Sequence, residues 1–216
     1  MERILSIILP AIPETLIMVG VSSLIAVIVG LPLGILLYAT QQGGLSDNPT
    51  VYKILDGFVN VFRSLPFAVL MLLVMPLTKL LIGRRIGTTA SIVPLTVTAI
   101  PFIARMLEGD FNGLNKGIIE AAKAMGSDTN IIVKKVVLKE SLPQIIATVT
   151  MTIINLVGQS AIVGLIGGGG LGDIALRYGY SRNQMDILWA ACIAIILLVQ
   201  LVQLIGNNLS KVLDKK

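Results

Sequence analysis

Charged residues are distributed so that five long stretches of the chain contain none. These stretches are rich in Leu, Ile, Val and Ala, and they cover residues 15–46, 64–78, 86–104, 141–172 and 187–210. A charged side chain is costly in hydrocarbon, so a charge-free apolar stretch is a candidate transmembrane helix. A helix needs about 20 apolar residues to cross a bilayer. Four of the stretches are therefore long enough, and only 64–78 is short.

The short second stretch gains length from its flanks. Apolar residues extend it within 58–62 on one side and 80–82 on the other. Arg63 and Lys79 then lie near opposite interfaces, where long basic side chains can reach the headgroups. The pattern predicts an all-α membrane protein with about five transmembrane helices in a single domain over residues 1–216.

Composition supports a membrane protein and excludes several other classes. Hydrophobic residues make up 55% of the chain and charged residues 13%, with a mean hydropathy of +0.88. A soluble domain carries about 25% charged residues, so a soluble globular enzyme is excluded. Histidine is absent and Cys192 is the only cysteine, which argues against a catalytic site, a disulfide, a cofactor or a metal site. Aromatic residues are only 5%, so we expect no nucleic-acid partner.

Basic residues predict the orientation of the chain, because Lys and Arg collect on the cytoplasmic side. If the chain crosses the membrane five times, eleven basic residues fall on one side and six on the other. The eleven are Lys53, Arg63, Arg105, Lys116, Lys123, Lys134, Lys135, Lys139, Lys211, Lys215 and Lys216, and the six are Arg3, Lys79, Arg84, Arg85, Arg177 and Arg182. The N-terminus is therefore expected outside and the C-terminus inside.

One long polar stretch interrupts the apolar pattern on the cytoplasmic side, at about 109–142. Residues 117–125 contain good helix formers, and Gly126 suits the left-handed position that ends a helix. Ser127 or Asp128 can then cap a second helix over about 129–139. The stretch is predicted to be a helix-turn-helix. It is either a connector on the membrane surface or a docking element for a cytosolic partner, and both alternatives stay open on the residues of this stretch.

Specific residues of this stretch carry a family resemblance. Glu120-Ala121-Ala122 followed by Gly126 resembles the EAA loop of ABC-importer permeases, although Lys139 stands where that family usually has proline. The runs 63–67, 92–105 and 164–180 resemble the methionine-importer permease group. The resemblance implies a non-catalytic permease of the bacterial cytoplasmic membrane that carries methionine, in both enantiomers, or related amino acids. Glu120, Ala121, Ala122 and Gly126 would then couple it to ATPase subunits.

The resemblance also implies partners. They are two cytosolic ATPase subunits and an extracytoplasmic substrate-binding protein or lipoprotein, in addition to membrane lipid. A single five-span chain is too small to enclose a pathway comfortably, so we expect a homodimer. Two alternatives stay open on the residues alone, a stand-alone secondary amino-acid transporter and a non-transporting scaffold protein. Secondary transporters usually show internal repeats, and none is visible in this sequence.

Two groups of residues are candidates for the pathway or its gate. Asn155, Gln159 and Ser160 are the only polar cluster deep in a charge-free stretch, and they either line a pathway or hydrogen-bond between helices. Gly167, Gly168, Gly169 and Gly170 form either a hinge or gate near the outer mouth or a plain loop. Gly167, Gly169 and Gly172 have the Gly-x-Gly-x-x-Gly spacing, but this does not predict a nucleotide site, because that site requires a preceding strand.

Two pairs of small residues are spaced for close helix packing. They are Gly30 with Gly34 and Ala190 with Ala194. Each pair packs either within the chain or against a second copy.

Overall fold

The computed structural model describes residues 2–214, and this part of the chain is helical without strands. In chain order the helices are α1 (Glu2–Thr40), α2 (Pro49–Ser64), α3 (Phe67–Ile82), α4 (Thr88–Asn112), α5 (Lys116–Ala124), α6 (Thr129–Ile132), α7 (Leu138–Glu140), α8 (Leu142–Gly164), α9 (Gly170–Ile174) and α10 (Met185–Leu213). Two π-helical turns, Val133–Val137 and Ala175–Tyr180, continue α6 and α9. An all-helical fold suits hydrocarbon, because each helix satisfies its own backbone polar groups.

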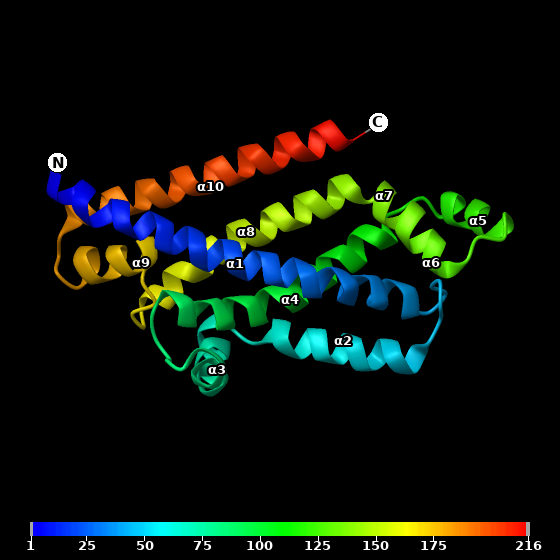
Figure 1. The fold of residues 1–216 in the computed structure, drawn as a ribbon, viewed down its shortest axis with the longest axis horizontal. Coiled ribbons are helices and arrows are strands. Elements are labelled where there is room, and N and C mark those ends of the chain that lie inside the picture. The colour runs from blue at the N-terminus through cyan, green and yellow to red at the C-terminus, as the bar shows by residue number, and fades with distance from the viewer. Residues whose placement is uncertain (1, 215–216) are drawn as a thin grey trace.

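The long helices run side by side along the molecule. In Figure 1, α1, α2, α4, α8 and α10 lie lengthwise, whereas α3 is seen end-on. The two termini lie toward opposite ends, and α5–α7 gather at the same end as the C-terminus. Within residues 2–214, α1, α4, α8 and α10 are long and apolar enough to cross a membrane, and a fifth span is counted if α2 and α3 form one broken span.

The predicted second span is not a continuous helix. α2 ends at Ser64, α3 begins at Phe67, and the two are bent by 110°. Leu65 is extended, at φ −82° and ψ 129°, since the ring of Pro66 disfavours the helical conformation of the residue before it. The predicted second span is therefore a broken one, made of two helices that are counted together as a fifth span.

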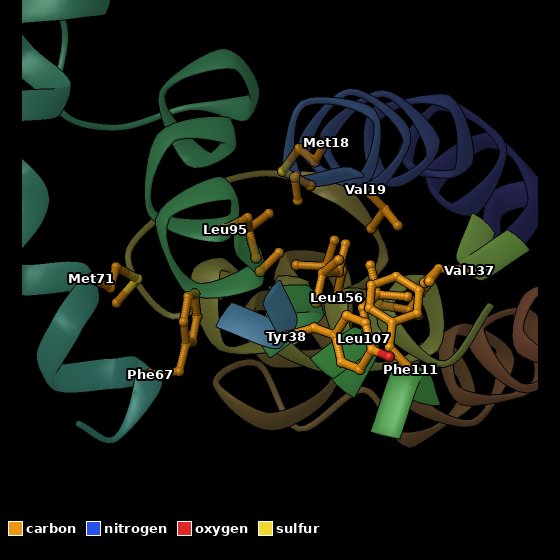
Figure 2. Close-up of a cluster of buried hydrophobic side chains, with 14 of the residues drawn as sticks. Met18, Val19, Tyr38, Phe67, Met71, Leu95, Leu107, Phe111, Val137 and Leu156 are labelled. Atoms are coloured by element: carbon orange, nitrogen blue, oxygen red, sulfur yellow. The ribbon is translucent and has the colours of Figure 1, made fainter. Parts of the chain in front are cut away.

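The core forms where α1 and α4 cross α8. Figure 2 shows Met18, Leu95, Leu107 and Leu156 converging in one cluster with Tyr38 and Phe111. The rings of Tyr38 and Phe111 meet edge to face, with centroids 5.7 Å apart. Large apolar side chains on the outside of α10, such as those of Trp189 and Leu197, are exposed. Exposed apolar surface on this scale suits a lipid environment.

Both pairs of small residues pack within the chain. A Cβ atom added at Gly30 would lie 3.0 Å from the Ile100 carbonyl oxygen, and one at Gly34 would lie 2.9 Å from that of Ala104. Both glycines therefore let α1 approach α4. Ala190 and Ala194 pack against the small core cluster that contains Ile8. These contacts support intrachain packing over a dimer seam.

Candidate functional site

The segment between α4 and α8 folds as two helical parts around a glycine turn. The Asn115 side chain caps α5 by accepting the Gly117 N–H at 2.9 Å. Gly126 has φ +75°, so it occupies the left-handed position that the sequence predicts. The Ser127 N–H then donates back to the Ala122 carbonyl oxygen at 3.1 Å. Asp128, one of the two residues proposed as a cap, accepts the Asn130 N–H and starts α6.

The second part of the segment departs from a regular helix. Residues 129–140 stay helical throughout, but Val133–Val137 widens into a π-turn. Lys139 lies inside α7, and the chain passes through Ser141 into α8, where Pro143 occupies the first turn. The segment is thus joined to α8 almost without a break.

The four residues assigned to coupling do not share one face. Glu120, Ala121 and Gly126 are exposed, whereas Ala122 is only 5% exposed and packs in the core with Ile119. The apolar positions of α5 therefore form two stripes. One stripe holds the segment on the bundle. The other stripe faces outward, where the exposed side chains of Ile118 and of Met125, the residue that follows α5, flank Ala121 along the sequence.

A cleft of about 410 Å³ opens between α5 and the loop after α1. Its wall includes charged, neutral polar and apolar side chains, namely Gln41, Gln42, Leu45, Phe111, Asn112, Lys116, Ile119, Glu120 and Lys123. The amides of Gln41 and Asn112 hydrogen-bond each other at 2.6 and 3.2 Å. Glu120 thus belongs to a concave surface and not to an isolated helix.

The polar cluster of α8 divides into two environments. Gln159 donates to the Asn155 side-chain oxygen at 2.9 Å, and Asn155 is exposed. Ser160 is only 3% exposed, and its hydroxyl donates to the Val157 carbonyl oxygen at 2.7 Å. Asn155 and Gln159 are therefore brought together on an outer face of α8, while Ser160 is turned away from them.

The glycines after α8 are packed tightly rather than loosely. Gly167, Gly169 and Gly170 have positive φ, a conformation that favours glycine. A Cβ atom at Gly168 would lie 2.1 Å from a Val163 methyl carbon, and one at Gly169 would lie 2.7 Å from a Glu14 carboxylate oxygen. The segment follows α8, so the structure gives the glycine pattern no strand to start from.

Glu14 of α1 holds this glycine segment. Its carboxylate accepts the Gly170 N–H at 2.6 Å, and the neighbouring Thr15 hydroxyl accepts the Leu171 N–H at 2.9 Å. In the sequence, Glu14 is only the charge that directly precedes the charge-free stretch 15–46. No sequence signal connects it with a partner 156 positions away.

Replacing Glu14 with alanine should therefore loosen α9. A hydrogen bond to a charged group contributes about 1.5–3 kcal/mol, so exchange of the Gly170 amide hydrogen should accelerate about tenfold or more. Glu14→Gln keeps an acceptor oxygen and should change the rate much less. Hydrogen exchange followed by mass spectrometry measures both variants, and equal rates in the two would contradict the role of Glu14.

Sequence reasoning also missed a charged network between α2 and α4. Arg105 pairs with Asp56 and, at 2.7 Å, with Glu108. Asn60 accepts from Arg105 at 3.0 Å, and the Tyr52 hydroxyl donates to Glu108 at 2.9 Å. Two carboxylates and one guanidinium leave the network with a formal charge of −1. In the sequence Arg105 serves only as a marker of orientation. Its pairing with Asp56, 49 positions away, depends on how α2 and α4 pack. Its pairing with Glu108 has the i,i+3 spacing that places two side chains on one helix face, and that spacing was a signal the sequence offered.

Comparison with known proteins identifies the family. A family model described as "Binding-protein-dependent transport system inner membrane component" matches residues 30–216. The chain belongs to this family. It is a multi-pass inner-membrane permease component, and the expected resemblance to transport permeases is confirmed.

Relatives of this permease span nearly its whole length. The "Probable D-methionine transport system permease protein MetI" of Vibrio cholerae is 43% identical to this chain. The match covers 97% of this chain and 93% of the relative. The "Methionine import system permease protein MetP" of Bacillus subtilis is 40% identical, with 84% of this chain and 82% of the relative covered. A solved structure described as inward-facing conformations of the MetNI methionine ABC transporter has a TM-score of 0.97 and 39% identity, with both chains fully covered.

Proposed function

We propose that this permease is the membrane-spanning subunit of a methionine ABC importer. The full-length similarity to relatives named as methionine permeases, together with the TM-score of 0.97, carries the proposal. Two copies would form the pathway and two cytosolic ATPase subunits would power it. An extracytoplasmic binding protein or lipoprotein would deliver the substrate. The permease itself would bind no ATP, because it lacks the Gly-Lys-Ser/Thr ending of a phosphate-binding loop.

The proposed orientation places α5–α7 and the C-terminus in the cytoplasm. Both lie toward one end of the molecule (Figure 1), and the α5–α7 segment at that end carries Lys116, Lys123, Lys134, Lys135 and Lys139. The opposite end holds the N-terminus and the glycine segment and would face outward. This assignment follows from the tendency of Lys and Arg to remain on the cytoplasmic side.

The segment Lys116–Glu140 is proposed to act as the coupling element. Its inward stripe, Ile119 with Ala122, packs in the same core cluster as Leu107 and Phe111 of α4. A partner that presses on Glu120 and Ala121 would therefore move the inner end of α4 with α5. The Arg105 network then carries that movement from α4 to α2. Closure of the ATPases on ATP would in this way alter the relative positions of the spanning helices.

Gly126→Val should weaken this coupling while leaving the spans inserted. An added Cβ has open space around it, so the whole effect comes from the left-handed backbone, which costs a side-chain-bearing residue about 1–2 kcal/mol. The native turn should then become about five- to thirty-fold less populated relative to alternatives. The amount of substrate moved per ATP hydrolysed should fall, as measured in proteoliposomes. Asn tolerates the left-handed region, so Gly126→Asn should retain coupling. Full coupling in Gly126→Val would show that the turn is not needed.

Selectivity is proposed to reside mainly in the binding protein. A free amino acid needs partners for its carboxylate and its ammonium group. The Asn155–Gln159 pair offers only neutral groups on an outer face of α8. Such a face could provide a weakly attractive lining once a second copy packs opposite it.

The assembly can be tested by purification and by labelling. The permease should copurify with an ATPase in a two-to-two complex, whereas isolation without any ATPase would contradict the proposal. Orientation is tested in a Cys192→Ser background, which removes the single native thiol. A membrane-impermeant maleimide should label Arg182→Cys in intact cells and should label Gly43→Cys only after the membrane is opened. The reverse pattern would overturn the orientation without affecting the family.

A further inference from the structure

The connection between α3 and α4 forms a basic hollow at the surface. Lys79, Gly83, Arg84, Arg85 and Ile86 line an open concavity of about 440 Å³. Its wall contains three cationic side chains and no acidic one. Gly83 makes the hollow possible, because its φ of +80° ends α3 in a left-handed cap and turns the chain back toward α4.

The basic side chains are positioned but not neutralised. The Arg84 guanidinium donates twice to the Thr89 hydroxyl oxygen, at 2.5 and 3.1 Å, which fixes one wall of the hollow. Every ion pair found within residues 2–214 involves Arg105 or Arg177, and none involves the hollow. Lys79 and Arg85 have no side-chain hydrogen bond in this described part of the chain. Three positive charges within seven residues therefore lack an anion.

An apolar surface runs directly into the hollow. α3 bends 110° away from α2, and one face of it packs on the bundle through Phe67, Met71 and Val74, while its other face is exposed. Large side chains on it are exposed, with Leu80 at 81% and Leu73 at 63%, and Ile86 continues this surface past the turn. Apolar surface of this kind beside a basic hollow matches a molecule with an acyl chain and an anionic head.

We infer that this hollow binds the headgroup of an anionic phospholipid. Its phosphate would lie between Lys79, Arg84 and Arg85, since guanidinium groups match phosphate geometry and donate in pairs. Its acyl chains would lie along Leu73, Leu80 and the neighbouring apolar residues of α3. A soluble anion would use only the basic part, so the joined apolar surface favours a lipid. The inference goes beyond the transport function, and it holds whichever end of the molecule faces outward.

Lipid counting on the purified protein tests this site without transport. The variant Lys79→Gln with Arg85→Gln removes the two unpaired charges and leaves Arg84 with Thr89. Arg3→Gln with Arg182→Gln is the matched control, because it removes two charges on the same side of the predicted membrane. Each protein is placed in nanodiscs of phosphatidylcholine with increasing phosphatidylglycerol. Native mass spectrometry then counts the phosphatidylglycerol retained by each protein.

The wild-type protein should retain phosphatidylglycerol preferentially, and 10 mM inorganic phosphate should not displace it. Each basic residue near an anionic surface contributes about 1 kcal/mol, so loss of two should weaken retention about 30-fold. The control should retain the lipid like the wild type. Equal retention by both double variants would overturn the inference, as would displacement by inorganic phosphate.

Two further results would assign the hollow to a protein instead. If the first double variant keeps its lipid but loses stimulation by the binding protein, the hollow is a protein docking surface. If it keeps its lipid but becomes monomeric in phosphatidylcholine nanodiscs, the hollow belongs to a contact between two copies. Either result overturns the lipid site while leaving the proposed importer in place.

Discussion

Arg105→Ala should lower the free energy of unfolding by about 3 kcal/mol, the low end for a buried ion pair broken from one side. The low end applies because the Arg105 side chain is partly exposed, at 22%. The loss arises mainly at Glu108, which is 4% exposed and would keep only the Tyr52 hydroxyl as a partner. Asp56 would also lose its contact across α2 and α4. Thermal unfolding in detergent micelles measures the change.

Two variants separate the network from a general loss of charge. Arg63→Ala removes an exposed arginine from α2. It should change the free energy of unfolding little, since exposed ion pairs contribute about 0–1 kcal/mol to stability. Glu108→Gln added to Arg105→Ala removes the stranded charge and should recover part of the stability. If Arg105→Ala unfolds at the same temperature as Arg63→Ala, the network does not hold α2 to α4.

Gly164→Ala should lower the free energy of unfolding at least as much as Arg105→Ala does, for a steric reason. The added Cβ would lie 2.4 Å from the backbone nitrogen of Asp173 and 2.7 Å from the Gly172 carbonyl carbon. Backbone atoms cannot rotate away as a flexible side chain can, so the end of α8 must separate from α9. Overpacking of this kind lowers the free energy of unfolding by about 1–3 kcal/mol and occasionally more, and we expect a loss at the upper end here.

Gly158→Ala is the matched control on the same helix. A Cβ atom there would meet nothing within 4 Å, and alanine is the better helix former by about 1 kcal/mol. It should therefore fold as well as the wild type or better. Unfolding temperatures and expression yields of the two variants provide the comparison. Similar behaviour of both would contradict the close α8–α9 contact.

The regular part of the fold follows from charge spacing. Four of the five charge-free stretches became the long helices α1, α4, α8 and α10, because a charge-free apolar segment has a single low-energy structure in hydrocarbon. The second stretch departed from this rule. Hydropathy measures only length and polarity, whereas the break after Ser64 is a local steric effect of Pro66.

The candidate site was only partly accessible from sequence. The left-handed turn at Gly126 depends on neighbouring residues, so local reasoning found it. Which helix face is buried depends on distant residues, and so the inward position of Ala122 could not be seen. The same is true of Glu14 with Gly170 and of Arg105 with Asp56. Charges at the edges of apolar stretches indicated topology, but their pairing is set by how the helices cross.

Methionine uptake by the complete complex tests the central claim most directly. The permease, its ATPase and its binding protein are reconstituted in proteoliposomes with ATP available to the ATPase. Radiolabelled methionine should then accumulate only with ATP and only with the binding protein, and excess unlabelled methionine should abolish the signal. ATP-independent uptake would contradict an ABC importer. ATP-dependent uptake that excess methionine leaves unchanged, but that a charged amino acid blocks, would contradict the methionine assignment alone.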